Sequence, residues 1–348
     1  MALTDTRIDV AEAARVLAYW GITIEEGAMT SGSGTANAAA IIDTGGARLF
    51  LKRRNPGYAR EDWVRFDHAL LAHLTDDGIP VPQVVPTDTG KTWIAEGGHI
   101  YELFTFIDGE QHRTGDPAQL QAAGETLGSI HLSTEGFKPP VEKEWGRFHD
   151  PQEAWRWLAE LKEIADREGL AEERDTLAQA SELAAELAER LSDAMYWSLP
   201  RTIVQADYHP ANLKFHGDEV VGVFDWDWAS AQPRMVDLAD GLLFFCGRRD
   251  TPLIGGDIWS LTEAFDLDVG RVSRFGGGYT RMVTPIPEEL AALPDLMRAR
   301  WLYSRADAAR RKVDEPGRLE FVTRELLRPL NAITRHEARL VDGRAFGT

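Results

Sequence analysis

The sequence predicts an α+β protein with two lobes, a small N-terminal lobe around an antiparallel sheet and a larger, mainly helical C-terminal lobe. Short apolar and β-branched runs separated by glycine turns fill residues 22–52 and 92–106, as expected for hairpin strands. From residue 116 onward, apolar side chains recur mostly at helical spacing. The 348 residues are enough to bury two sizeable cores. We therefore place the lobes at residues 1–105 and 106–348.

The N-terminal lobe is expected to open with a helix and to continue as three strands. The helix is predicted over residues 9–19, and the strands over 22–26, 38–43 and 48–52. Ser31-Gly32-Ser33-Gly34 precedes the second strand, and the third strand ends at Lys52. Kinases clamp a nucleotide with this layout, because glycines let backbone N–H groups approach phosphate and the lysine adds a positive charge. Taken alone, the Ser/Gly run would more often be an ordinary hairpin turn.

The other elements follow from periodicity and from helix-breaking residues. A helix over residues 60–74 must end before Pro80 and Pro82, because proline cannot continue a helix. The further elements expected are strands at 92–95 and 99–106, a helix at 117–132, two helices within 153–192, and amphipathic helix through 288–339.

The stretch from Gln205 to Trp228 carries the chemistry. Asp207 and Asn212 lie on one loop between apolar runs, and a predicted hairpin then leads to Asp225. Two carboxylates and an amide brought together in this way suit phosphoryl transfer. One carboxylate orients or deprotonates an attacking hydroxyl, while the amide and the second carboxylate hold the magnesium ion that bridges the nucleotide phosphates.

The pattern Asp-x-His-Pro-x-Asn, followed thirteen residues later by Phe-Asp-Trp, resembles the aminoglycoside phosphotransferase family, which includes choline- and homoserine-kinase-like proteins. The family loop usually opens His-Gly-Asp, whereas this chain has Gln205-Ala206-Asp207. The resemblance implies a bilobal protein-kinase-like fold that uses ATP and Mg²⁺. It also implies that Asp207 is the catalytic residue and that Asn212 and Asp225 are the metal ligands.

The resemblance extends to the nucleotide site. It implies that Ser31, Gly32, Ser33 and Gly34 cradle the phosphates, and that Lys52 is held by a helix carboxylate. Asp67 is the favoured partner of Lys52, with Glu61 in reserve. Backbone groups near Glu102 to Phe104 would meet the purine edge, just before a crossover at Ile107-Asp108-Gly109. Asp237 would brace the catalytic loop from a helix start, and His131 would be structural.

Composition limits the partners. No apolar run is long enough for a membrane span, and residues 1–21 do not resemble a signal peptide. The single cysteine, Cys246, fits a buried position in a cytoplasmic protein. The net charge of −18 argues against nucleic acid as a partner. The same charge favours a cationic small substrate, although solubility explains it equally well.

The sequence thus predicts an ATP- and Mg²⁺-dependent phosphotransferase that acts on a hydroxyl group of a small, amine-bearing molecule. A Ser/Thr protein kinase is an alternative, but the chain lacks His-Arg-Asp, Asp-Phe-Gly and Ala-Pro-Glu segments. A catalytically inactive nucleotide-binding protein is a second alternative, motivated by Gln205-Ala206 and by Asp67. The sequence leaves open the acceptor, the choice of ATP over GTP, and the oligomeric state.

Overall fold

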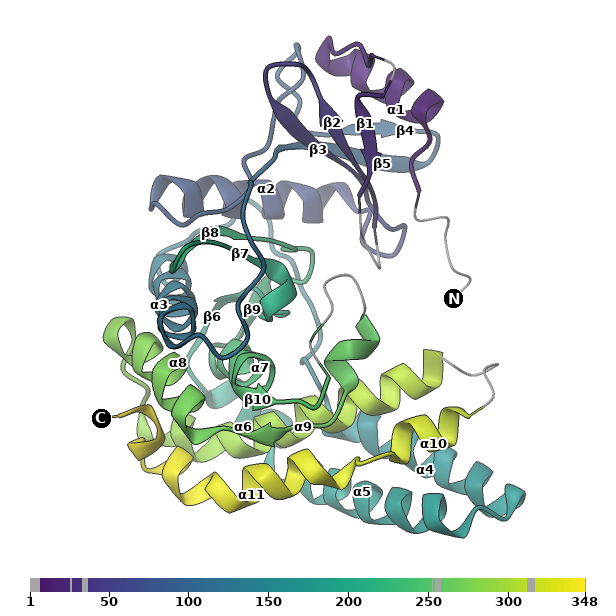
Figure 1. The fold of residues 1–348 in the computed structure, drawn as a ribbon, viewed down its shortest axis with the longest axis vertical. Helices are drawn as coiled ribbons and strands as arrows, with labels where there is room; N and C mark the ends of the chain where they lie inside the picture. The colour runs from purple at the N-terminus through teal and green to yellow at the C-terminus, as the bar shows by residue number, and fades with distance from the viewer. Residues whose placement is uncertain are drawn as a thin grey trace.

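The computed structural model describes residues 7–347 except 26, 33–36, 252, 254–257 and 312–316. The predicted phosphate-cradling residues Ser33 and Gly34 lie outside the described residues. The element order is that of a β-rich segment followed by a helical one (Figure 1).

A five-stranded antiparallel sheet dominates the N-terminal third, with strand order β1-β2-β3-β5-β4. Its strands are β1 (Met29–Ser31), β2 (Ala38–Asp43), β3 (Arg48–Arg53), β4 (Ile94–Glu96) and β5 (His99–Thr105). Helix α1 (Val10–Leu17) covers one face, where Val16, Leu17 and Trp20 pack with Leu51 and Leu103. This small hydrophobic cluster holds the sheet together.

The strand predicted at residues 22–26 is wrong for the part that is described. Residues 22–25 form no strand, and the edge strand is β1, in which Met29 pairs with Ile42. The β-branched residues that suggested a strand, Ile22 and Ile24, instead pack against the small cluster beside α1. Burial of their side chains accounts for the apolar pattern without any ladder pairing.

Helix α2 (Glu61–Asp76) lies between the sheet and the helical part of the molecule (Figure 1). Its apolar side belongs to the large hydrophobic core of the C-terminal part, which includes Phe66, Leu70, Leu71 and Leu74. The helix predicted over residues 60–74 is thus observed. It ends with a turn before Pro80, consistent with the two prolines.

The C-terminal part is mainly helical. Its helices are α3 (Pro117–Thr134), α4 (Pro151–Glu168), α5 (Ala171–Arg190), α6 (Asp193–Ser198), α7 (Met235–Cys246), α8 (Val269–Met282), α9 (Pro287–Arg311), α10 (Arg318–Thr323) and α11 (Leu327–Val341). Two of them begin alike, since Asp116 and Asp150 accept backbone N–H bonds and proline follows at the first helical position. The two helices predicted within residues 153–192 are α4 and α5.

Three short antiparallel strand pairs complete this part. They are β6 (Arg201–Val204) with β9 (Ser230–Pro233), β7 (Leu213–His216) with β8 (Glu219–Val223), and β10 (Gly247–Arg248) with β11 (Asp266–Leu267). The predicted hairpin after the central loop is therefore β7–β8. Together β6, β7, β8 and β9 fix both ends of the segments that carry Asp207 and Asp225.

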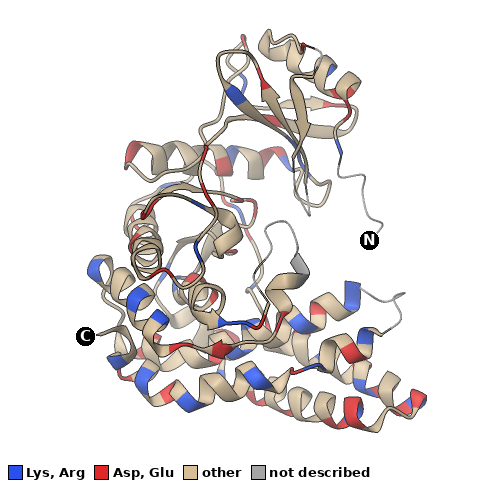
Figure 2. Ribbon diagram, in the orientation of Figure 1, with Lys and Arg blue, Asp and Glu red and all other residues tan. Residues whose placement is uncertain are grey.

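Charged residues of both signs are interspersed over the C-terminal helices (Figure 2). Several arginines whose role the sequence leaves open form ion pairs here, for example Arg298 with Asp295 at 2.8 Å and Arg311 with Asp307 at 2.7 Å. In the part of the chain that the structure describes, no helix is both long and apolar enough to cross a membrane.

Candidate active site

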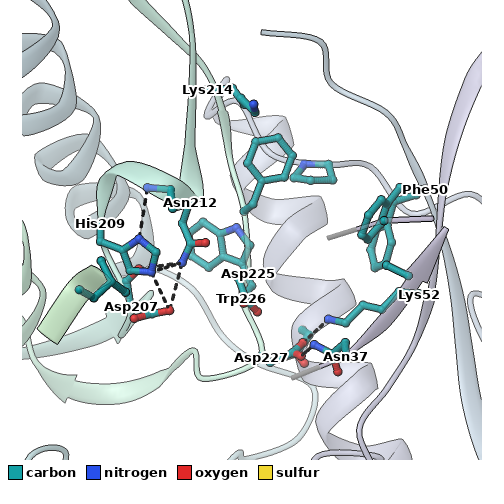
Figure 3. A pocket seen from close by; sticks show the side chains of 18 of the residues that line it. Asn37, Phe50, Lys52, Asp207, His209, Asn212, Lys214, Asp225, Trp226 and Asp227 are labelled. Atoms are coloured by element: carbon teal, nitrogen blue, oxygen red, sulfur yellow. Dashed lines mark hydrogen bonds and ion pairs between the residues drawn. The ribbon is translucent and has the colours of Figure 1, made fainter. Parts of the chain in front are cut away.

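A cavity of about 540 Å³ lies between the sheet and the helical part, and both contribute side chains to it. Lys52 of β3 and Phe104 of β5 line it from the sheet, and Asp207, Asn212 and Asp225 line it from the central loop and hairpin. Figure 3 shows two groups of bonded side chains in this cavity, one around Asp207 and one around Asp227. The predicted phosphate lysine, base and metal ligands thus share one cleft.

Asp237, in the first turn of α7, braces the loop that presents Asp207. Its carboxylate accepts the backbone N–H groups of Gln205 and Ala206, both at 2.7 Å. His131 of α3 is fully buried and lies 3.2 Å from the same carboxylate. The sequence-based expectation for Asp237 and for His131 is thereby confirmed at the level of contacts.

Gln205 occupies the position where the family usually carries histidine. Its buried side-chain amide donates to the carbonyl groups of Phe224 at 2.9 Å and Asp225 at 2.8 Å. Its side-chain oxygen accepts the backbone N–H of Asp207 at 2.8 Å. One side chain therefore ties the catalytic loop to the segment that carries the predicted metal ligand.

The Asp207 carboxylate has two hydrogen-bond donors and one arginine close to it. Its Oδ2 is 3.1 Å from His209 Nε2 and 3.1 Å from Asn212 Nδ2, and its Oδ1 is 3.6 Å from Arg300 Nη2. His209 Nδ1 accepts the Ala211 backbone N–H at 3.2 Å, so the ring proton belongs on Nε2, facing Asp207. Burial opposes ionisation, but His209 and Arg300 outweigh it and hold the pKa of Asp207 below its ordinary value. His209 thus shapes and polarises the loop.

Asn212 and Asp225 offer oxygen atoms to a cation. Asn212 uses its Nδ2 on Asp207, which leaves the amide oxygen available. The Asp225 carboxylate faces the solvent of the cleft and has no hydrogen bond or ion pair among the described residues. Loss of water around the carboxylate and the neighbouring Asp227 carboxylate raise the pKa of Asp225, and the charge of Lys52 only partly opposes them. Such a donor set fits a hard divalent cation completed by water and phosphate oxygens.

No group of three or more His, Cys, Asp or Glu side chains in the described ranges is arranged around a common metal position. An all-protein cage, as in zinc sites, is therefore not formed by these residues. A two-ligand magnesium site with phosphate as the further ligand does not need one.

The predicted ion pair between Lys52 and Asp67 is not formed, and Lys52 does not pair with the reserve candidate Glu61 either. Its Nζ lies 2.5 Å from Asp227 Oδ1, and Asn37 Nδ2 donates to Asp227 Oδ2 at 2.7 Å. Burial opposes ionisation of Asp227, but Lys52 and Arg54 outweigh it and lower its pKa. No firm role for Asp227 followed from the sequence, although its position two residues after Asp225 was a usable signal.

Asp67 points into a different set of buried charges. It forms ion pairs with Arg54 at 2.7 Å and with Lys143 at 2.5 Å. Its short side chain is met by two longer cations, one from the end of β3 and one from the segment between α3 and α4, and this explains why the predicted partner was wrong. Lys143 Nζ also donates to the backbone carbonyl of Asp227 at 2.7 Å.

Glu102 does not face the cavity. Its side chain is fully buried and bonds Arg54 at 2.5 Å and His68 at 2.8 Å, and its backbone pairs with Lys52 inside the sheet. Phe104 does line the cavity, but it pairs with Phe50 on one edge and with Val84 on the other. These pairings use the backbone of Glu102 and Phe104, and the N–H groups of Thr105 and Phe106 are likewise donated, to the carbonyls of Gln83 at 2.9 Å and Arg48 at 3.2 Å. Ile107, which follows them, also lines the cavity.

Of the predicted glycine-rich cradle, Ser31 and Gly32 are described. Ser31 is exposed and paired in β1, and it is not part of the cavity lining. Gly32 does line the cavity, and its N–H donates to the Ala39 carbonyl at 2.9 Å. A Cβ atom at Gly32 would lie 2.8 Å from the Cβ of Ala39, so close packing of the two strands requires glycine here.

Helix α9 forms the wall opposite the sheet, which sequence reasoning missed. Arg300, Tyr303, Ser304, Asp307 and Arg311 line the cavity from one face of this helix. Their spacing of three and four residues was visible in the sequence, but nothing there showed that this face meets the cavity.

A small antiparallel sheet above a helical body, with a polar cleft between them, is the architecture of protein-kinase-like phosphotransferases. The chain belongs to the phosphotransferase enzyme family (APH), whose model matches residues 30–271. It is a small-molecule kinase that acts on a hydroxyl group. Nucleoside triphosphate and divalent metal use goes with this class.

Curated relatives include homoserine kinases. The enzyme of Rhodopseudomonas palustris is 27% identical over 293 residues, which covers 84% of this chain and 78% of that protein. The enzyme of Zymomonas mobilis is 27% identical over 268 residues, covering 74% of this chain and 72% of the relative.

Solved structures share the fold at lower identity. Amicoumacin kinase hAmiN, solved with AMP-PNP, Ca²⁺ and Ami, has a TM-score of 0.68 at 16% identity and covers 92% of this chain and 93% of its own. A microcompartment-associated aminopropanol kinase has a TM-score of 0.66 at 18% identity and covers 96% and 99%.

Proposed function

We propose that the protein transfers the γ-phosphoryl group of Mg²⁺-bound ATP to a hydroxyl of a small, amine-bearing acceptor, with homoserine-like amino alcohols as the first candidates. The observation that carries the proposal is that Asp207 lies beside Asn212 and that both line one cavity with Asp225. A base and two cation ligands in one cavity are what an in-line transfer between oxygens requires.

In this proposal Asp207 accepts the proton of the acceptor hydroxyl while the hydroxyl oxygen forms its bond to phosphorus. The bond between phosphorus and the bridging oxygen of ADP breaks, and ADP leaves with the electron pair. Because the transition state of such transfers is loose, holding the hydroxyl in line matters more than the basicity of Asp207. The lowered pKa of Asp207 keeps it ionised for this task at neutral pH.

Asn212 and Asp225 would hold the magnesium ion, which neutralises charge on the phosphates when bound. Lys52, at the end of β3, is the cation placed for the phosphates, once they replace Asp227 as its partner. Backbone groups at Ile107, which lines the cavity just after the strand pairings end, would take the base, and Gly32 would approach the phosphates from the sheet. Ser33 and Gly34 keep their predicted role on sequence grounds.

The acceptor class is supported by relatives and by charge. Homoserine kinases align over most of the chain, and an aminopropanol kinase shares the fold. The formal net charge of −18 also favours an amine-bearing molecule over an anionic polymer. The single cysteine is buried as Cys246, which fits the proposed cytoplasmic location.

The test is magnesium-dependent ADP release over homoserine, amino alcohols, amino sugars and aminoglycosides, with wild-type protein and Asp207→Ala. We expect acceptor-dependent release that falls by at least about 10³-fold in the variant, because hydroxyl positioning and proton acceptance are lost together. Asp218→Ala, which removes a carboxylate with 63% side-chain exposure in the β7–β8 turn, serves as the matched control. Equal release by wild type and Asp207→Ala on every acceptor would refute the assignment.

A further inference from the structure

Arg300 of α9 holds its guanidinium beside the catalytic carboxylate. Its Nε donates to Asp240 Oδ1 at 2.7 Å, and its Nη1 donates to the hydroxyl of Ser304. Its Nη2 lies 3.6 Å from Asp207 Oδ1, which is too long for a hydrogen bond. Two nitrogens are therefore fixed by the protein, while the third faces the cavity next to Asp207 without a hydrogen-bond partner among the described residues.

The group is built rigidly. The guanidinium carbon lies 5.1 Å from the centre of the Phe244 ring, and Asp240 beneath it is fully buried. The Arg300 side chain is 12% exposed, so its positive charge has lost most of its water. Burying an arginine and a carboxylate in this way costs desolvation free energy that their attraction barely offsets, so the pair is a poor device for stability alone.

The environment of Asp240 also indicates that the pair adds little to stability. Asp240 Oδ2 is buried and has no hydrogen-bond partner within the described part of the chain, and burial raises the pKa of Asp240 to about 7. Arg300 opposes this rise and so favours the ionised form of Asp240. On its cavity side, Arg300 Nη2 has the 3.6 Å ion pair with Asp207 but makes no hydrogen bond to the described residues.

A guanidinium with one free nitrogen at a ligand cavity is suited to a charge-assisted hydrogen bond with an oxyanion, above all a carboxylate. The phosphates have a separate cation in Lys52, which lies with Asp227 rather than with Asp207. The free Nη2 of Arg300 instead borders the position of the acceptor hydroxyl, which must lie within hydrogen-bond distance of Asp207.

Resting on the proposed function, we propose that Arg300 binds a carboxylate carried by the acceptor, so that the substrate class is hydroxy acids and hydroxy amino acids rather than simple amino alcohols or amino sugars. The 3.6 Å between Arg300 Nη2 and Asp207 Oδ1 limits how far apart the hydroxyl and the carboxylate of the substrate can be. With a hydrogen bond at each end, the carboxylate lies within about 9 Å of the reactive hydroxyl. Homoserine satisfies this condition, whereas 3-amino-1-propanol is the same molecule without the carboxylate.

The experiment compares these two acceptors on wild-type protein, Arg300→Gln and Arg300→Lys. We expect wild type to prefer homoserine in kcat/KM by at least about 100-fold, because the charge-assisted bond to carboxylate exists for it alone. Arg300→Gln should lower kcat/KM for homoserine about 100-fold and that for 3-amino-1-propanol less than about tenfold. Arg300→Lys should recover part of the preference, since lysine keeps the charge but loses the fork geometry.

Arg281→Gln, an exposed arginine of α8 paired only with Glu125 among the described residues, is the control and should match wild type. Thermal unfolding of each variant separates a folding defect from a binding defect. Calorimetric titration of wild type in Mg·ADP with homoserine and with 4-hydroxybutyrate gives a readout that needs no turnover.

An equal loss on both acceptors would overturn the proposal, because Arg300 would then act through Asp207 or the phosphoryl group. Failure of both carboxylates to bind would overturn it as well. Turnover of carboxylate-free acceptors alone would leave the phosphotransferase function standing without the carboxylate site. Absence of Asp207-dependent turnover on any acceptor, with homoserine still bound through Arg300, would instead count against the proposed function.

Discussion

Ala206 and Asp225 both adopt left-handed backbone conformations, with φ of 71° and 58°. Such a φ costs a non-glycine residue about 1–2 kcal/mol. At Ala206 the cost is offset by the two backbone hydrogen bonds to Asp237. The conformation also explains why glycine is usual at this place in the family loop, and why alanine, the smallest alternative, can replace it here.

Gln205 supplies a prediction at the residue scale. Gln205→Ala should leave the carbonyl groups of Phe224 and Asp225 without a donor, costing about 1–3 kcal/mol of unfolding free energy. Because Asp225 then loses its tether, half-maximal activity should need several times more Mg²⁺. Urea unfolding and a magnesium titration of activity measure the two effects.

Gln205→His, which restores a ring donor, should retain more activity than the alanine variant. An unchanged magnesium requirement would refute the tether.

At the element scale, α3 and α8 approach each other through glycine. A Cβ atom at Gly124 would lie 1.9 Å from the backbone oxygen of Phe275, and one at Gly278 would lie 2.2 Å from that of Gln121. Neither oxygen can move without its helix. The two helices therefore touch backbone to backbone beneath the catalytic loop, where Tyr208 donates to the carbonyl of Ala123 at 2.8 Å.

Gly124→Ala should destabilise the protein by at least about 1–3 kcal/mol, because overpacking outweighs the better helix propensity of alanine. Gly136→Ala is the matched control: a Cβ atom there would meet nothing within 4 Å, and its effect should stay within about 0.5 kcal/mol. Urea unfolding of both variants tests the contact. Similar midpoints for the two would show that the helices can separate at small cost.

Helix boundaries were largely predictable, since the spacing of apolar residues in α2, α3, α4 and α5 reports burial directly. The strand at residues 22–26 was not, because a short apolar run is equally compatible with packing beside α1. That Asp207, Asn212 and Asp225 line one cavity was predictable, because they share one loop and hairpin. The partners of Lys52 and Asp67 were missed because they are distant in the sequence. Asp227 lies 175 residues from Lys52, and Lys143 lies 76 residues from Asp67.

At the scale of the whole molecule, Lys143 fastens α2 to the segment that follows Asp225, the proposed metal ligand. It is buried, pairs with Asp67 on α2, donates to the Asp227 carbonyl, and lies 5.7 Å from the Trp63 ring centre. Together with the apolar face of α2, this contact makes the helix part of the large core. Movement between the lobes is therefore expected between the sheet and α2.

Lys143→Met keeps the apolar stem but removes the charge, so Asp67 would retain only Arg54 and the Asp227 carbonyl would lose a donor. We expect a loss of about 2–4 kcal/mol in unfolding free energy, as for breaking a buried ion pair. Lys162→Met removes an exposed pair with Asp166 and should cost less than about 0.5 kcal/mol. Unfolding in urea at constant pH compares the two. A small effect at position 143 would show that Arg54 alone suffices for Asp67.

The contact between the sheet and α2 has a thermodynamic consequence. Arg54 and Glu102 on the sheet meet Asp67 and His68 on the helix, so ionic contacts stand beside the apolar packing of Phe104 at this boundary. Exposing charged groups to water lowers heat capacity, whereas exposing apolar groups raises it. Opening of the lobes along this boundary would therefore carry a smaller heat-capacity change per exposed area than unfolding does. The balance between open and closed forms should accordingly vary gently with temperature while the stability of the fold itself varies steeply.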